Sequence, residues 1–139
     1  MAKVNTGRVI LGGLLAGLII DVSESILNTV VLGQANDALM QARNLPPMDN
    51  RMIAWFMVLG FLPGIGTVWL YAAIRTRYGA GPATAIVAAV GVWFLAYLYP
   101  SAFLVVMGMF PAGLTALALL WGLAEIILAS VAGAWLYSE

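Results

Sequence analysis

The sequence predicts an all-α integral membrane protein, with four transmembrane helices forming one domain over residues 1–139. Hydrophobic residues make up 63% of the chain, and charged residues make up only 9%. A soluble domain carries about 25% charged residues, so this composition is typical of a chain that lies in lipid. The mean hydropathy is +1.00, and four separate stretches each approach or exceed the about 20 mostly apolar residues that a helix needs to cross a bilayer.

The predicted spans cover roughly residues 9–32, 52–74, 83–110 and 113–137. Each must be helical, because lipid offers no partner to a bare backbone N–H or C=O group. Lys3 and Arg8 precede the first span, as basic residues precede the apolar part of a signal peptide. No small-residue cleavage site follows Ile20, and Asp21 stands there instead. We therefore interpret the first span as a membrane helix that is not cleaved.

The connectors support this division. Residues 33–51 form the only substantial predicted loop, in which Ala35–Ala42 is compatible with a short interfacial helix. A second connector holds Arg75 and Arg77, and the third is an uncharged tight turn near Pro111. Each spacing fits helices that run up and down through the bilayer.

Orientation follows from lysine and arginine, which favour the cytoplasmic side of a membrane. The basic residues on the predicted side of the termini are Lys3, Arg8, Arg75 and Arg77, and those on the other side are Arg43 and Arg51. We therefore expect both termini to be cytoplasmic and the loop at residues 33–51 to face outward.

The composition argues against several classes of function, because the residues that they require are absent from the chain. The chain has no cysteine and no histidine, which removes disulfides, thiolate catalysis, the common zinc and iron–sulfur ligands and the usual acid–base group. The net charge is zero and no basic tract exists, so nucleic-acid binding is not expected. Ser25 beside Glu24 is too weak a pairing for a nucleophile and its base. We predict no catalytic residues, no cofactor, no metal and no enzymatic activity.

Three carboxylates lie inside predicted spans: Asp21 and Glu24 in the first and Glu125 in the fourth. A charge in mid-membrane costs about 2.5–3.5 kcal/mol on insertion scales, and no basic residue lies in any span centre. At 1.5 Å per residue, Asp21 lies about 18 Å from Val9 and Glu125 about 18 Å from Tyr137. Neighbouring first and fourth helices would bring the three acids to one level, where at least one, Glu125 first, is expected to be protonated at neutral pH.

Two interpretations of this polar set remain open. Asp21, Glu24, Asn28 and Glu125 form a possible proton or cation site, because they have no counter-charge in the membrane. Alternatively, protonated acids serve as hydrogen-bond donors that hold helices together. The two interpretations have about equal weight.

Small residues share the faces of the carboxylates, and they favour close helix packing in lipid. In the first helix Gly13 and Gly17 form a GxxxG motif, and in the fourth helix Ala118, Gly122, Ala129, Ala132 and Gly133 share the face of Glu125. The predicted packing residues are Gly13, Gly17, Gly60, Gly64, Gly122 and Ala129. The polar groups should therefore point into helix contacts rather than into acyl chains.

Two prolines lie within predicted spans, Pro63 in the second and Pro100 in the third. Interrupted helices mark binding sites in many transporters, but a membrane proline more often only kinks its helix, and we favour that alternative. Tyr97 is interpreted as a packing residue.

The layout resembles a group of uncharacterised small bacterial inner-membrane proteins (domain of unknown function), which share four spans, a longer first loop and glycine-rich helix starts such as Gly12–Gly17. The resemblance implies a bacterial inner membrane location and no assigned activity. The architecture also looks like that of small multidrug resistance transporters, whose first helix carries a glutamate; Glu24 or Asp21 would take that place.

Two functions are expected from these features. The first is an accessory or structural subunit of a larger membrane complex, because the chain has abundant small-residue faces and little interior. The second is a homo-oligomeric carrier or channel for small solutes, coupled to protons or cations by the buried carboxylates. The expected partners are the lipid bilayer and other membrane subunits or further copies of the chain.

Overall fold

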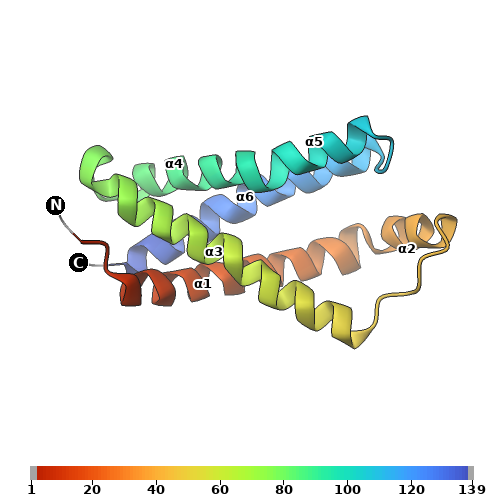
Figure 1. Ribbon diagram of the computed structural model, residues 1–139, viewed down its shortest axis with the longest axis horizontal. Helices are drawn as coiled ribbons and strands as arrows, with labels where there is room; N and C mark the ends of the chain where they lie inside the picture. Colours follow the sequence, from red (N-terminus) through yellow and green to blue (C-terminus); the bar gives the residue numbers. More distant parts are fainter. Residues whose placement is uncertain (1–2, 138–139) are drawn as a thin grey trace.

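The computed structural model describes residues 3–137, which are helical with no strand in that range. Within it, four helices are long and apolar enough to cross a membrane, and the first is α1 with a π-helical extension. The elements in order are α1 (Thr6–Ile26), a π-helical segment (Leu27–Val31), α2 (Gly33–Ala42), α3 (Asn50–Tyr78), α4 (Pro82–Trp93), a second π-helical segment (Phe94–Leu98), α5 (Tyr99–Val106) and α6 (Ala112–Leu136). Figure 1 shows them as one bundle.

Two helix starts are set by short polar side chains. The Asn5 side chain accepts a hydrogen bond from the Arg8 N–H at 3.1 Å, and the Asp49 side chain accepts one from the Met52 N–H at 2.8 Å. Such caps satisfy backbone donors that the first helical turn leaves open. The short helix expected within the loop is present as α2.

The end of the third span was predicted wrongly. The prediction extended it to Phe110, whereas α5 ends at Val106. Gly108 has a φ of +73°, which favours glycine, and its N–H donates to the Val105 carbonyl at 2.9 Å. The positive φ ends the helix, so the connection to α6 is longer than a tight turn at Pro111.

Neither proline ends a helix at its own position. α3 runs through Pro63 without interruption, and the Thr67 hydroxyl donates to the Pro63 carbonyl at 2.6 Å. Pro100 is the second residue of α5 and lies two residues after the π-helical segment Phe94–Leu98, where the backbone winds more widely than in an α-helix. Such π-helical turns occur frequently at functional sites, and this one lies beside the site described below.

The helices pack where glycines let their backbones meet. A Cβ on Gly64 would lie 2.7 Å from Gly17 Cα and 2.8 Å from the Gly13 carbonyl oxygen. A Cβ on Gly12 would collide with the Gly133 carbonyl of α6. α1 is thus held between α3 on one side and α6 on the other, and both neighbours run antiparallel to it.

Burial is concentrated toward the end of the molecule that carries the termini. Buried residues of α3 occur only between Gly64 and Ala72, and those of α4 only between Thr84 and Ala89. No described residue of α2 or α5 is buried. In Figure 1 α6 lies beside α1 near the termini and is farther from it in the part of the molecule that carries α2. We call these two parts the terminal end and the α2 end.

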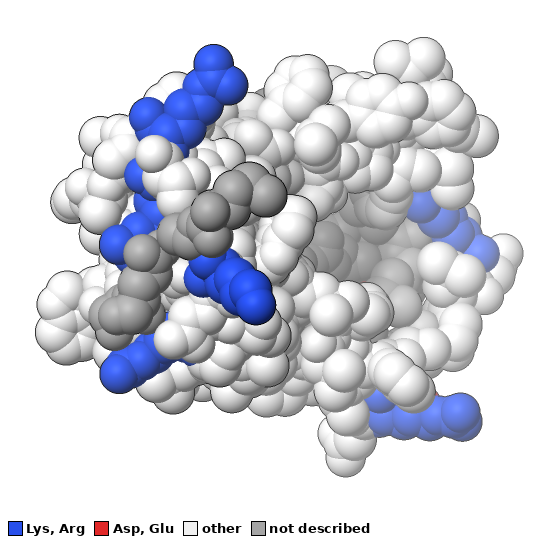
Figure 2. Space-filling model, turned by 60° about the vertical axis from the view of Figure 1, so that its left-hand side comes forward, with Lys and Arg blue, Asp and Glu red and all other residues white. Residues whose placement is uncertain are grey.

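Basic residues are divided between the two ends as the sequence suggested. Lys3, Arg8, Arg75 and Arg77 flank the terminal end, whereas Arg43 follows α2 and Arg51 begins α3. Figure 2, turned to bring the terminal end forward, shows basic side chains gathered there and others at the opposite end. Which end faces the cytoplasm remains a prediction.

Candidate functional site

The fold brings Glu24 of α1 and Glu125 of α6 into contact, so that each carboxyl group faces the other. Glu125 is only 4% exposed, and its Oε2 atom has no hydrogen-bond partner among the described residues. Glu24 is half-buried. We call these two residues the carboxyl pair. A proton on either group would turn their contact into a hydrogen bond.

Tyr97 is the third group at the pair. Its hydroxyl donates to Glu125 Oε1 at 3.5 Å, a long hydrogen bond. Its ring lies against Gly122, where a Cβ would be 2.9 Å from Tyr97 Cδ1. Gly122 therefore makes room for the ring one turn from Glu125. The interpretation of Tyr97 as mere packing was incomplete, because a hydroxyl in an apolar span also needs a polar partner.

Asp21 lies beside the pair but in a separate contact. It is 8% exposed, and a Cβ on Gly60 of α3 would collide with its Oδ1 atom. Its Oδ2 atom has no hydrogen-bond partner among the residues described. Asp21 is one turn from Glu24 on the same helix and close enough to act on it electrostatically. The glycine at position 60 thus leaves space for an acid at the α1–α3 crossing.

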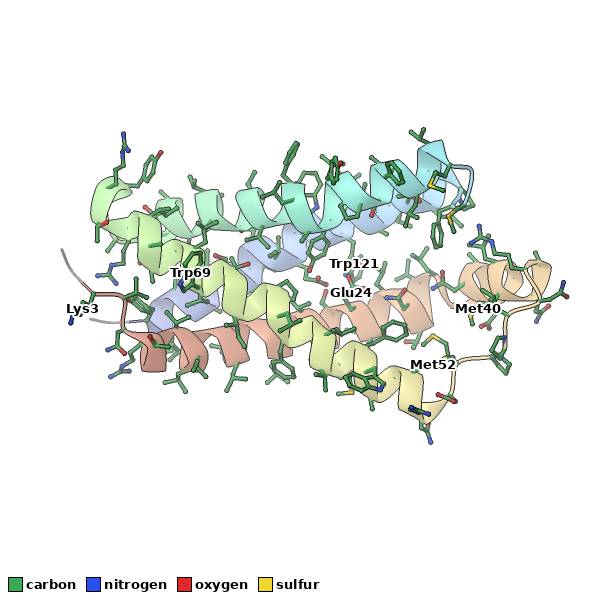
Figure 3. The ribbon with its side chains drawn as sticks, in the orientation of Figure 1. Lys3, Glu24, Met40, Met52, Trp69 and Trp121 are labelled. Atoms are coloured by element: carbon green, nitrogen blue, oxygen red, sulfur yellow. The ribbon has the colours of Figure 1, made fainter. Side chains whose placement is uncertain are left out.

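Ser23 and Trp121 form the wall on the other side of the pair. The Trp121 Nε1–H donates to the Ser23 hydroxyl oxygen at 2.8 Å, joining α6 to α1, and the same hydroxyl faces Glu125. Beyond this bond lies an apolar groove of about 440 Å³ on the outer face of α1 and α6. Figure 3 shows Glu24 and Trp121 in the middle of the bundle, away from Lys3 at one end and Met40 at the other.

Asn28 extends the site toward the α2 end. Its side-chain amide donates to Glu24 Oε2 at 2.8 Å, and its carbonyl oxygen accepts from the Asn36 amide of α2 at 3.1 Å. Asn28 is exposed and Asn36 half-buried. A line of polar side chains therefore leads from α2 to the carboxyl pair, and the sequence analysis did not include its first member, Asn36.

The arrangement suits a proton better than a metal ion. Among the described residues, no three or more Asp or Glu side chains gather closely enough to hold a metal. The Tyr97 phenol, the Ser23 hydroxyl and the Asn28 amide instead surround the two acids of the carboxyl pair. Two carboxylates in contact cannot both keep their charge without a counter-charge, and the sequence has no basic residue at this depth.

Small residues account for how closely the site is enclosed. Gly13, Gly17 and Gly64 lie at the α1–α3 crossing, and Ala129 is fully buried in the core. Gly12 and Gly133 also meet backbone to backbone. Gly133 lies on the small-residue face predicted for the fourth helix, whereas Gly12, four residues before Ala16, was not predicted to pack.

No known protein family matches the chain, and no curated protein or solved structure matches it either.

Proposed function

We propose that this chain is a proton-binding subunit of a multi-pass membrane carrier or channel for small solutes, assembled from more than one copy. The observation that carries the proposal is the contact between Glu24 and Glu125 on two different helices. A proton entering or leaving a contact between helices changes how strongly those helices attract one another. Such a pair can couple proton binding to helix movement, as proton relays in membrane transporters do.

The geometry favours this proposal over a purely structural role for the acids. A purely structural role requires every buried polar atom to be satisfied, yet Asp21 Oδ2 lacks a partner among the described residues. Unsatisfied carboxyl oxygens are costly in a dry interior. Their presence supports a site that binds and releases a small cation, the proton being the smallest.

Protonation is tested by infrared spectroscopy of the protein in nanodiscs. We expect the carbonyl band of a protonated carboxyl group at pH 7, because the two acids in contact share one proton. Glu125→Gln and Glu24→Gln should each remove or shift this band. Asp37→Asn, in exposed α2, should leave it unchanged. A spectrum with only ionised carboxylates at pH 7 and no bound cation would contradict the proposal.

We further propose that both termini lie in the cytoplasm, because four of the six basic residues flank the terminal end, and that the membrane is a bacterial inner membrane, as the resemblance to small bacterial inner-membrane proteins implies. Ala38 is exposed on α2, and the chain has no natural cysteine. In intact cells, Ala38→Cys should therefore react with a maleimide that does not cross membranes. Labelling that occurs only after lysis would reverse the orientation.

A second candidate function is that of an accessory subunit in a larger membrane complex. It is favoured by the first part of α3, where Trp55, Phe56 and Val58 are each more than half exposed. A helix exposed on all sides contacts either lipid or further helices. Native mass spectrometry from nanodiscs separates the two candidates. A homo-oligomer supports the carrier or channel, and a fixed ratio to unrelated chains supports the accessory subunit.

A further inference from the structure

The carboxyl pair lies at the boundary between a closed and an open part of the bundle. Toward the terminal end, α1 is buried along Val9, Gly13 and Ile20. Toward the α2 end, Leu27 and Leu32 are still buried, but Asn28 and Thr29 between them are exposed, and no residue of α3 before Gly64 is buried. In Figure 1 α6 diverges from α1 over this same part. The pair is thus the innermost polar point of the open part.

The polar residues of the open part are not all equivalent. The Ser25 and Thr29 hydroxyls donate to backbone carbonyls one turn earlier, at 2.7 and 2.6 Å, so lipid can surround them at little cost. The Asn28 amide likewise donates to the Glu24 backbone carbonyl, at 2.9 Å, but it also donates to the Glu24 carboxyl group, and the Asn28 carbonyl oxygen accepts from the Asn36 amide. Exposed amide and carboxyl groups of this kind are stable in a membrane only beside water or protein.

The terminal end is closed by an aromatic and basic cluster. Tyr71 and Tyr137 lie edge to face with ring centroids 6.1 Å apart, and the Arg75 guanidinium lies 5.1 Å from the Tyr137 ring centroid. The Tyr137 hydroxyl accepts from the Asn5 N–H at 3.1 Å, and the Tyr71 hydroxyl accepts from the Gly81 N–H at 3.2 Å. These contacts tie together the ends of α3 and α6 and the starts of α1 and α4.

We infer that the structure is a one-sided state, in which a water-filled vestibule at the α2 end reaches Glu24 and the terminal-end cluster excludes water from the other side. This inference rests on the proposed function and adds the direction of proton access, because protons reach the carboxyl pair from the side of α2. Asn28 positions Glu24 at the inner end of the vestibule. Among the described residues, the charged group that faces the carboxyl pair is Asp21, whose side chain lies against Gly60 of α3, and the second π-helical segment contributes the Tyr97 hydroxyl.

Single cysteines test the vestibule, because the natural chain contains none. Asn28→Cys on α1 and Ala118→Cys on α6 lie on the faces that carry Glu24 and Glu125. Ile26→Cys and Ala124→Cys are matched controls, because both positions are exposed but lie away from the pair on the same two helices. We expect an impermeant maleimide, applied from the side that labels Ala38→Cys, to react with the first two at least tenfold faster than with the controls.

The outcomes separate this inference from the proposed function. Equal, slow labelling of all four cysteines would show that lipid or protein fills the space, and labelling of Asn28→Cys and Ala118→Cys only from the opposite side would reverse the direction. Either result overturns the vestibule. Fast labelling without a protonated carboxyl band would leave the vestibule standing and reject the proton-binding function.

Asn28→Leu gives a second test that does not depend on cysteine chemistry. It removes the amide that holds Glu24 and places an apolar group in the vestibule. Hydrogen–deuterium exchange of the carboxyl pair, followed by its infrared band, should slow at least several-fold. Thr29→Val is the matched control on the neighbouring position, since the Thr29 hydroxyl donates to the Ser25 carbonyl of its own helix and, within residues 3–137, to no group of the carboxyl pair. Unchanged exchange in Asn28→Leu would contradict the role of Asn28 at the entrance.

Discussion

Gly64→Ala is expected to lower the free energy of unfolding by about 1–3 kcal/mol or more, the range for an overpacked core. The added methyl group would lie 2.7 Å from Gly17 Cα and 2.8 Å from the Gly13 carbonyl oxygen. Both are backbone atoms of α1, so no side-chain rotation can relieve the collision. The two helices must separate, and the dispersion contacts along their crossing are then weakened. Thermal unfolding in mild detergent measures the effect.

Gly66→Ala is the matched control, two residues further along the same helix. A Cβ at Gly66 would meet no atom within 4 Å. Because alanine has a higher helix propensity than glycine, this variant should be as stable as the natural protein or slightly more so. If both variants unfold at the same temperature, the close crossing of α1 and α3 at Gly64 does not exist in the membrane.

The sequence was sufficient to predict the apolar helices because length and hydropathy alone determine them. The predicted bounds of the first, second and fourth spans lie within a few residues of α1 with its extension, α3 and α6. The error at Phe110 arose because Met109 and Phe110 are as apolar as the helix before them, and hydropathy does not report a positive φ at Gly108. A backbone angle ended the helix there, and composition gave no sign of it.

The site was harder to predict than the spans. Helical periodicity placed Asp21, Glu24 and Asn28 on one face, and equal depth suggested that Glu125 would meet them. Neither consideration could separate Asp21, which lies against Gly60, from the pair that is in contact. The place of Tyr97 at the carboxyl pair could not be predicted, because the direction of its side chain depends on the π-helical segment Phe94–Leu98, which shifts the faces of the third span. The sequence offers no simple pattern for that segment.

Glu125→Gln should fold like the natural protein but bind about one proton fewer per chain, since the amide cannot titrate. Glutamine has the shape of glutamate, its amide can donate to Glu24, and its carbonyl can accept from the Tyr97 hydroxyl, which now bonds to Glu125 Oε1. Thermal unfolding in detergent measures whether the variant folds, and proton uptake measured with a pH indicator gives the number of bound protons.

Glu125→Ala is the contrasting variant, because it leaves the Tyr97 hydroxyl without this acceptor and opens a cavity between α1 and α6. It should therefore lose stability as well as the proton. If Glu125→Gln takes up as many protons as the natural protein, the carboxyl pair is structural and the accessory subunit becomes the better proposal. If it fails to fold, the Glu125 carboxyl group makes a contact that an amide cannot replace, and the picture of two acids that share a proton is contradicted.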